Sequence, residues 1–209
     1  MNVTKEVCVE SLAEALNAVH AGASRIELCE NLAVGGTTPS YGTIKKCGEL
    51  LPVPFMVMIR PRGGDFVYTD DEFDVMKEDI LICKELRVPG VVFGLLTASG
   101  QIDIPRTQEL IELARPLQVT FHKAIDEVTD IPEATRQLKE LGVNRILSSG
   151  GQPTALEGAV MLRRMMEIAK NEMHIIVAGK VTNDNFEQVK SLVLSDEYHG
   201  RRLVGDITL

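Results

Sequence analysis

The sequence Met-Ile-Arg-Pro-Arg-Gly-Gly-Asp-Phe occupies residues 58–66 and ends an apolar run that begins at Val53. That run has the length and the composition of a buried β-strand. Pro61 fixes φ and supplies no N–H, so we expect the strand to stop there, and the two glycines that follow free the backbone to turn. The charged residues at the carboxyl end of this strand are Arg60, Arg62 and Asp65.

Two interpretations of this nonapeptide are open. In the first it is a surface loop whose arginines are solvated or paired with nearby carboxylates, which is the usual state of charged side chains. In the second it is a ligand site, in which Arg60 and Arg62 bind an anion. We favour the ligand site, because a buried strand that ends in three charged residues is hard to explain by packing.

Strand and helix patterns alternate along the whole chain. Ser11 and Thr154, each with a glutamate three residues later, predict helix starts, and Asp70 or Asp71 and Thr182 are expected to cap two further helices. Short β-forming runs predict strands over residues 6–10, 25–29, 54–60, 90–93, 117–121, 144–147, 174–178 and 197–199.

This alternation predicts a parallel sheet covered by helices. Eight repeats fit an α/β fold, a TIM-type (β/α)8 barrel, formed as a single domain over residues 1–209. The alternative is an open doubly wound sheet, which usually carries a Gly-rich phosphate loop after its first strand, and none follows here. Only ten residues follow His199, too few for a full eighth helix. We expect that flank to be open or covered by a neighbouring subunit, which predicts a homo-oligomer.

Composition and charge limit the partners. The net charge of −8 argues against nucleic acid and against an anionic membrane surface, both of which require a basic patch. No apolar run approaches the roughly 20 residues of a membrane span. The N-terminus lacks the apolar region of a signal peptide, so we expect a cytoplasmic protein with reduced cysteines.

The period of two along each predicted strand gathers polar residues on one face. Because helices cover the outside of a barrel, the apolar partners belong outside and the polar set points inward. Burying an unpaired carboxylate costs several kcal/mol of folding free energy. In one interpretation Glu6 or Glu27 therefore forms an internal salt bridge with Arg60. In the other, the polar residues line a functional cavity. The inward set is Glu6, Cys8, Glu10, Glu27, Cys29, Met56, Met58, Arg60, Thr120 and His122.

Three further strand ends carry candidate site residues. His122 directly ends an apolar strand, and is either a hydrogen-bonded core residue or a group for proton transfer or ligation. Ser148-Ser-Gly-Gly151 precedes a helix and offers backbone N–H groups to an anion, at Ser149, Gly150 and Gly151. Lys180 is close to the usual phosphate position of barrel enzymes.

The four cysteines divide into two pairs. Cys47 and Cys83 fall on apolar helical stripes and are expected in the core. Cys8 and Cys29 lie on inward faces of neighbouring strands, which are about 4.8 Å apart. Thiolate and thioether ligands select Cu(I), so these two thiols, with Met58, are a candidate metal site. Small apolar thiols that fill the barrel are equally consistent with the pattern.

Taken together, these segments resemble the CutC copper homeostasis proteins along nearly the whole chain. The resemblance implies a TIM-type barrel, a cytoplasmic role in copper tolerance and Cu(I) binding through cysteines, for which Cys8 and Cys29 hold the matching positions. Two departures concern the seventh and eighth strands: Lys180 follows Gly179 where many members have a glycine pair, and the chain stops at Leu209 where many are longer. The matching segments are Glu6–Cys8, Arg25–Cys29, Gly35–Ser40, Ile59–Phe66, Thr120–Asp126, Ser148–Gly151 and Ala178–Gly179.

Two functions therefore remain as hypotheses. The first, which we adopt as the expected one, is a copper homeostasis protein that binds Cu(I) at Cys8 and Cys29. The second is a barrel enzyme that acts on a small anionic metabolite at a polar barrel mouth. In the second, Arg60 and Arg62 bind the anion, and the candidate acid–base groups are His122, Glu27 and Asp65.

Overall fold

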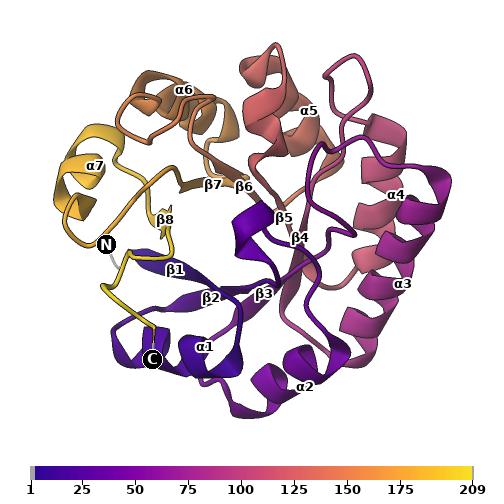
Figure 1. Ribbon diagram of the computed structural model, residues 1–209. Coiled ribbons are helices and arrows are strands. Elements are labelled where there is room, and N and C mark those ends of the chain that lie inside the picture. The colour runs from indigo at the N-terminus through magenta and orange to yellow at the C-terminus, as the bar shows by residue number, and fades with distance from the viewer. Residues whose placement is uncertain (1–2, 209) are drawn as a thin grey trace.

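The computed structural model of the protein describes residues 3–208, and within them eight parallel strands close into a barrel in sequential order (Figure 1). The predicted (β/α)8 fold is confirmed. The strands are β1 (Thr4–Val9), β2 (Arg25–Leu28), β3 (Phe55–Met58), β4 (Gly90–Phe93), β5 (Gln118–Phe121), β6 (Arg145–Ser148), β7 (His174–Val177) and β8 (Glu197–His199). The helices are α1 (Leu12–His20), η1 (Leu32–Val34), α2 (Tyr41–Leu50), α3 (Asp70–Glu85), α4 (Ile104–Ala114), η2 (Lys123–Glu127), α5 (Ile131–Leu141), α6 (Ala159–Ala169) and α7 (Phe186–Val193).

Side chains at the starts of α1, α2, α3, α4 and α5 accept hydrogen bonds from backbone N–H groups that the helix leaves unpaired. The Ser11 side chain caps α1 by accepting from the N–H of Glu14 at 3.1 Å, as predicted. Helix α3 is capped one residue before the predicted aspartates, by Thr69, which forms a reciprocal capping box with Glu72. The aspartates therefore supply negative charge to the first turn instead of the cap.

Two other predicted caps are wrong. Thr154 accepts from the N–H of Glu157 at 3.2 Å, but this segment forms only turns, and α6 begins later, at Ala159. Thr182 likewise precedes its helix. Its backbone N–H donates to the side chain of Asn185 at 2.8 Å, and Asn185 is the residue before α7. Both hydrogen bonds close a turn in the loop before the helix and do not cap the helix itself.

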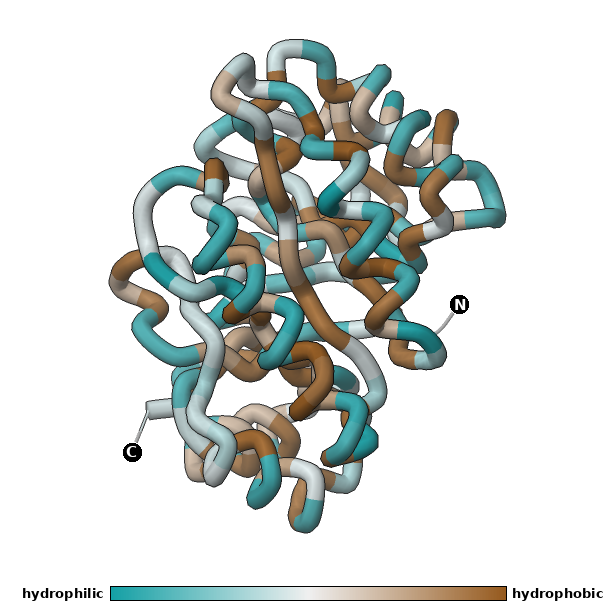
Figure 2. Tube along the Cα trace, turned by 90° about the vertical axis from the view of Figure 1, so that its right-hand side faces the viewer, coloured by the Kyte–Doolittle hydropathy of each residue, from teal (hydrophilic) through white to brown (hydrophobic). Residues whose placement is uncertain are grey.

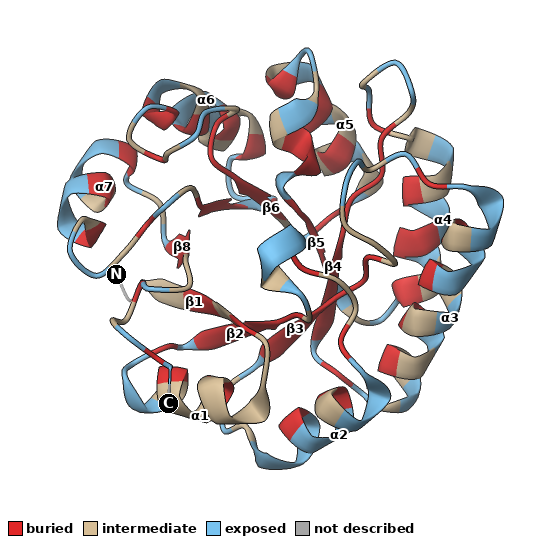
Figure 3. Cartoon of the chain, viewed as in Figure 1, coloured by how far each residue is buried: buried red, intermediate tan, exposed pale blue. Residues whose placement is uncertain are grey.

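The main hydrophobic core lies between the strands and the helices. Outward-facing strand residues such as Val7, Val9, Ile26 and Leu28 are fully buried there, as the period of two predicts. Figure 3 shows the strands mostly buried, and most of the exposed residues lie on the outer faces of the helices and in loops. Apolar and polar residues alternate along the helices in the side view of Figure 2. No helix within residues 3–208 is long and apolar enough to cross a membrane.

The barrel interior is packed separately from this core. One small cluster contains Cys29, Met56, Met58 and Val92, and we call it the sulfur-rich cluster. A second contains Leu147, Ile176 and Ala178. Most of the remaining inward positions are polar. Charged and sulfur-containing side chains therefore fill much of the space that Val, Ile and Leu usually fill inside a barrel.

The chain that follows β8 covers the flank where an eighth helix would lie. Residues 200–208 form no helix, yet Leu203 and Ile207 are buried in the main core. The side chain of Asn17 on α1 donates to the carbonyl of Ile207 at 3.2 Å, and Figure 1 shows this end of the chain beside α1. The flank is therefore not open. Self-association stays a prediction, but it no longer follows from a gap in the barrel.

The short helix η1 lies across the carboxyl end of the barrel, where Figure 1 shows it in indigo over the centre. Leu32 packs against the sulfur-rich cluster, and its N–H donates to Glu10 Oε1 at 2.8 Å. The carbonyl of Val34 accepts from Arg60 at 3.0 Å. Side chains that follow β1 and β3 thus hold η1 over the barrel mouth.

Candidate functional site

Buried ion pairs occupy the amino-terminal half of the barrel interior. Arg25 on β2 forms ion pairs with Glu6, which lies in register with it on β1, and with Glu197 on β8, at 2.5 Å in the latter case. Arg145 Nε lies 3.1 Å from the same Glu197. The predicted salt bridge from Glu6 to Arg60 is wrong, because Arg60 lies at the opposite, carboxyl end of its strand.

The charge state of Glu6 follows from this environment. Burial acts to raise the pKa of Glu6, but the charge of Arg25 and the hydrogen bond from His199 outweigh it and lower the pKa to about 2. His199 Nδ1 lies 2.9 Å from Glu6 Oε1, so the carboxylate both pairs with Arg25 and orients the imidazole. Glu6 is therefore a structural carboxylate that positions its neighbours.

A group of potential metal ligands lies one level higher in the barrel. Atoms of Cys8, Glu27 and His199 that can bind a metal all lie within 4.8 Å of one another. Glu27 is in register with Cys8, and its Oε2 lies 3.8 Å from His199 Nε2, so it does not pair with Arg60 as predicted. Sequence analysis missed His199, although the alternation of Glu197 and His199 in the last strand was a usable signal.

Cys29 adjoins this group without being part of it. Its thiol donates to Glu27 Oε2 at 3.5 Å, and it is fully buried beneath the loop that follows η1. A Cβ at Gly36 would lie 3.3 Å from Cys29 Sγ and 3.6 Å from Met58 Cε, so the bare backbone of Gly36 lets the loop cover both sulfur side chains. The predicted Cys8 and Cys29 therefore both lie near Glu27, and Met58 packs in one cluster with Cys29.

Charges inside this group favour a protonated imidazole. Burial alone would lower the pKa of His199, but the charge of Glu27, the neighbouring Cys8 and the hydrogen bond to Glu6 raise the pKa well above its ordinary value. Burial, the largest influence on Glu27, raises the pKa of that carboxyl. Burial followed by the charge of Glu27 also raises the pKa of the Cys29 thiol well above its usual range. The positively charged imidazolium of His199 thus lies beside the buried carboxyl groups of Glu6 and Glu27.

Arg60 holds the loops over the barrel mouth. Its Nη1 donates to the carbonyls of Val34 at 3.0 Å and Gly36 at 3.1 Å, and its Nη2 donates to that of Gly64 at 2.6 Å. The guanidinium stacks on the ring of Phe66, with 4.7 Å from Cζ to the centroid. Only Nε has no partner, and no carboxylate within residues 3–208 forms an ion pair with this side chain. Arg60 is a buried cation without a counter-ion.

His122 is held in one orientation beside Arg60. Its Nδ1 accepts from the N–H of Ala124 at 3.2 Å, and its ring packs on Phe66 with centroids 4.8 Å apart. Burial and then the charge of Arg60 lower the pKa of His122 to about 3. We therefore assign a neutral ring with its proton on Nε2, because Nδ1 accepts a hydrogen bond. Nε2 is buried and without a partner, so this ring offers a hydrogen-bond donor to the interior.

Replacing His122 with asparagine should change how stability depends on pH, because the asparagine oxygen keeps the acceptor for Ala124. With a folded pKa of about 3 and an unfolded value near 6.5, the stabilisation by neutral His122 is complete above 6.5 and is lost as the pH falls toward 3. The free energy of unfolding of the wild type should therefore fall by up to about 1.4 kcal/mol more than that of the variant for each pH unit in that window. Urea unfolding at a series of pH values measures this, and parallel curves would contradict the assignment.

The predicted anion site at Ser149, Gly150 and Gly151 is occupied by a side chain of the protein itself. Asp126 accepts from the N–H of Ser149 at 3.0 Å, from the N–H of Gly151 at 2.9 Å and from the hydroxyl of Ser148 at 2.5 Å. Burial acts to raise the pKa of Asp126, but these hydrogen bonds and the charge of Lys123 hold it below its usual range. In this backbone nest the N–H groups of Ser149 and Gly151 are thus paired with a carboxylate of the protein itself, and that of Gly150 donates to the Ser148 hydroxyl at 2.9 Å. Binding of a separate anion by these three residues stays a prediction.

Three other predicted site residues lie apart from the barrel interior. Arg62 donates to Glu72 at 2.6 Å and to Asp65 at 3.1 Å, so its charge is already paired. The Asp65 side chain is 68% exposed. Lys180 is exposed and has a left-handed backbone at φ 54°. None of these three side chains joins the group around Glu27, and their roles in ligand binding stay predictions.

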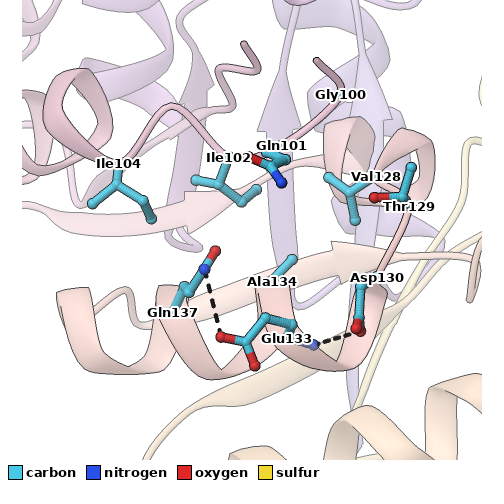
Figure 4. A pocket seen from close by; sticks show the side chains of 10 residues that line it. All are labelled: Gly100, Gln101, Ile102, Ile104, Val128, Thr129, Asp130, Glu133, Ala134 and Gln137. Carbon is cyan, nitrogen blue, oxygen red and sulfur yellow. Dashed lines mark hydrogen bonds between the residues drawn. The ribbon is translucent and has the colours of Figure 1, made fainter.

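A surface hollow beside α5 carries none of the predicted site residues. Its lining comes from the loop before α4 and from the start of α5, and its polar contacts are the Asp130 cap on the N–H of Glu133, at 2.9 Å, and the contact of Gln137 with Glu133 (Figure 4). These contacts stabilise the helix start. The group of potential metal ligands lies instead inside the barrel.

Comparison with known proteins agrees with this geometry. The model of the CutC family matches residues 3–203. The human copper homeostasis protein cutC homolog is 44% identical over 194 residues, which cover 93% of this chain and 71% of that one. A CutC family protein from Vibrio vulnificus strain YJ016 is 46% identical over 187 residues, which cover 88% and 75% of the two chains.

A solved structure of a CutC protein also superposes on this chain. The crystal structure of a putative copper homeostasis protein CutC from Streptococcus agalactiae superposes with a TM-score of 0.92 at 38% identity, and covers 96% of this chain and 99% of that one. Deoxyribose phosphate aldolase from Aeropyrum pernix has a TM-score of 0.67 at 14% identity, with coverage of 97% and 87%, which shows a shared barrel fold alone. By the extent of these matches, the chain belongs to the CutC family.

Proposed function

We propose that the protein acts in copper homeostasis by binding Cu(I) through Cys8 and Cys29 inside the barrel. The observation that carries the proposal is the group formed by Cys8, Glu27 and His199, whose ligand atoms lie within 4.8 Å of one another, with the Cys29 thiol 3.5 Å from Glu27. Relatives named for copper homeostasis support the same role.

The donor set suits Cu(I) better than a hard cation. Thiolate and thioether sulfurs select Cu(I), and the imidazole of His199 also binds copper once it has released its proton. Cys8 and His199 lie on the neighbouring strands β1 and β8 with their ligand atoms within 4.8 Å of one another, and the Cys29 thiol already donates to Glu27. A carboxylate beside two thiols supplies a base for the protons that the sulfurs must release before they bind a metal.

We place this role in the cytoplasm. Cu(I) and free thiols both persist in a reducing compartment, and all four cysteines of the chain are free. Cys8 is partly accessible, whereas Cys29 is covered by the loop after η1. Delivery of copper to both sulfurs therefore requires this loop to move.

An anaerobic Cu(I) titration against a competing chelator tests the proposal. We expect the Cys8→Ser/Cys29→Ser variant to bind Cu(I) at least about 100-fold more weakly, because loss of an outer-sphere partner alone already costs 10–100-fold in metal affinity. The matched control is Cys47→Ala/Cys83→Ala, which removes two thiols from α2 and α3 and should retain the wild-type affinity. Tight binding by the serine variant would overturn the assignment of these ligands.

A second function is supported by a separate observation. Arg60 is buried without a carboxylate partner, which favours a barrel mouth that binds a small anionic metabolite. Since Arg60 follows β3, whereas Cys8 lies on β1 and Cys29 directly follows β2, copper binding and anion binding can be tested separately. Arg60→Ala should remove any affinity for small anions if this second function holds.

A further inference from the structure

We infer that the barrel mouth binds the carboxylate group of a small molecule between Arg60 and His122, beneath η1. The inference rests on the second proposed function, and it names the chemical class of the ligand and the atoms that bind it. It does not depend on copper.

The first observation is an uncompensated charge. The Arg60 side chain is only 4% exposed, and no carboxylate within residues 3–208 forms an ion pair with it. A buried charge without a partner is strongly unfavourable, so native proteins pair such groups or bind a ligand with them. Asp65, the nearest acidic residue in sequence, is exposed and pairs with Arg62 instead. The Nε–H of Arg60 is the donor that remains for a counter-ion.

The second observation is that β3, β4 and β5 bring Arg60 and His122 together. Met58 is in register with Val92 and Phe93 with Phe121, so Arg60, Gly94 and His122 come next along three neighbouring strands. A Cβ at Gly94 would lie 2.5 Å from His122 Nδ1, which shows that the imidazole lies over Gly94 on the way to Arg60. The Phe66 ring contacts both side chains.

The third observation concerns polar atoms that are buried without a partner. Arg60 Nε and His122 Nε2 are donors, and the hydroxyls of Thr120 and Tyr68 can donate, whereas Glu27 Oε1, in the group of potential metal ligands, is an acceptor. The Nε2 of His122 carries a proton in the assigned tautomer and has no partner. The hydroxyl of Thr120, one inward position below His122 on β5, is buried and also unpartnered. Buried donors are almost always paired in native proteins, so these two atoms and Arg60 Nε mark the position of ligand oxygens.

Charge and donor number select the ligand class. One uncompensated positive charge matches the single negative charge of a carboxylate, whose two oxygens accept hydrogen bonds from Arg60, His122 and Thr120. A phosphate dianion would bring a second negative charge into the same buried space without a partner. His122 acts here as a hydrogen-bond donor, because its Nδ1 is occupied by the N–H of Ala124.

Side-chain nitrogen NMR of the copper-free, full-length protein tests the inference with acetate as the probe. The His122 ring signals, identified by their loss in His122→Asn, should report a neutral ring protonated at Nε2 and should shift saturably with acetate but not with chloride at the same ionic strength. His122→Asn and Thr120→Val should each weaken acetate binding about tenfold, the equivalent of one hydrogen bond. Arg164→Gln, which removes a surface arginine of α6 paired with Glu167, is the matched control and should bind acetate as the wild type does.

The outcomes separate the inference from the function on which it rests. Saturable binding of inorganic phosphate in place of acetate, lost in His122→Asn, would keep an anion-binding barrel mouth and overturn the carboxylate assignment. Binding of neither anion would show that water alone pairs with these donors and would overturn both. Acetate binding unchanged in His122→Asn and Thr120→Val would place the anion elsewhere and also overturn the inference.

Discussion

Replacing Arg25 with methionine should lower the free energy of unfolding by about 3 kcal/mol, because the change leaves two buried carboxylates without their shared partner. Arg25 lies between Glu6 and Glu197, and all three side chains are at most 7% exposed. The expected loss is at the lower end for a broken buried ion pair, since His199 still contacts Glu6 and Arg145 still contacts Glu197.

The pH dependence of the stability difference between wild type and Arg25→Met tests whether lost ion pairs cause it. Glu6 has a folded pKa of about 2 against a usual 4.5, so its stabilising interaction is complete above 4.5 and is lost as the pH falls toward 2. The difference between wild type and Arg25→Met should therefore shrink over that window in urea unfolding. The triple variant Arg25→Met/Glu6→Gln/Glu197→Gln removes the charges of these three side chains together and should recover part of the loss, since His199 and Arg145 then lack a carboxylate partner here. A deficit that does not vary with pH would indicate lost packing instead.

Replacing Asp126 with alanine should cost about 2–4 kcal/mol, because it leaves several buried donors unpaired. The carboxylate accepts from the backbone N–H groups of Ser149 and Gly151 and from the hydroxyl of Ser148, and it pairs with Lys123 at 3.1 Å. These contacts join the end of β5 to the turn after β6. Their loss should loosen the carboxyl ends of both strands.

The emptied nest should then bind an external anion. Formate is small enough to take the place of the missing carboxylate, so it should stabilise Asp126→Ala in a concentration-dependent way. Thermal unfolding with formate and with chloride at equal ionic strength measures this. Leu138→Ala, a core substitution on α5 of comparable expected cost, is the control and should show no specific response to formate. An equal response of both variants would contradict the idea that the nest binds the anion.

The buried charged groups of the molecule are of two kinds, those with full partners inside the protein and those without. The network around Arg25 and the nest around Asp126 are internally satisfied, so they stabilise the barrel without needing a ligand. The group around Cys8 and the space between Arg60 and His122 are different, because each leaves ligand atoms or donors without full partners. Function is therefore expected at these two places.

Short-range patterns in the sequence were sufficient for the fold. The alternation of β-forming runs with helical repeats predicted eight strands, and all eight occur in the closed barrel. The period of two also predicted which strand faces point inward, since Val7 and Val9 lie in the outer core. The helix caps were less predictable. Thr154 and Thr182 close turns in loops, where the same local hydrogen bonds form without a helix.

The sequence by itself determined the fold, the inward faces and the polar character of the barrel mouth, because these depend on periodicities that each segment carries alone. Only the tertiary structure decided the partners. His199 meets Glu6 across 193 positions because β8 closes against β1, and Arg25 pairs with Glu6 because the register of β1 and β2 aligns them. Asp126 pairs with two of the N–H groups that were expected to hold a ligand, and Arg60 is buried without an ion pair to any carboxylate of residues 3–208. Register and ring closure bring distant side chains together, and neither is encoded in the spacing of neighbouring residues.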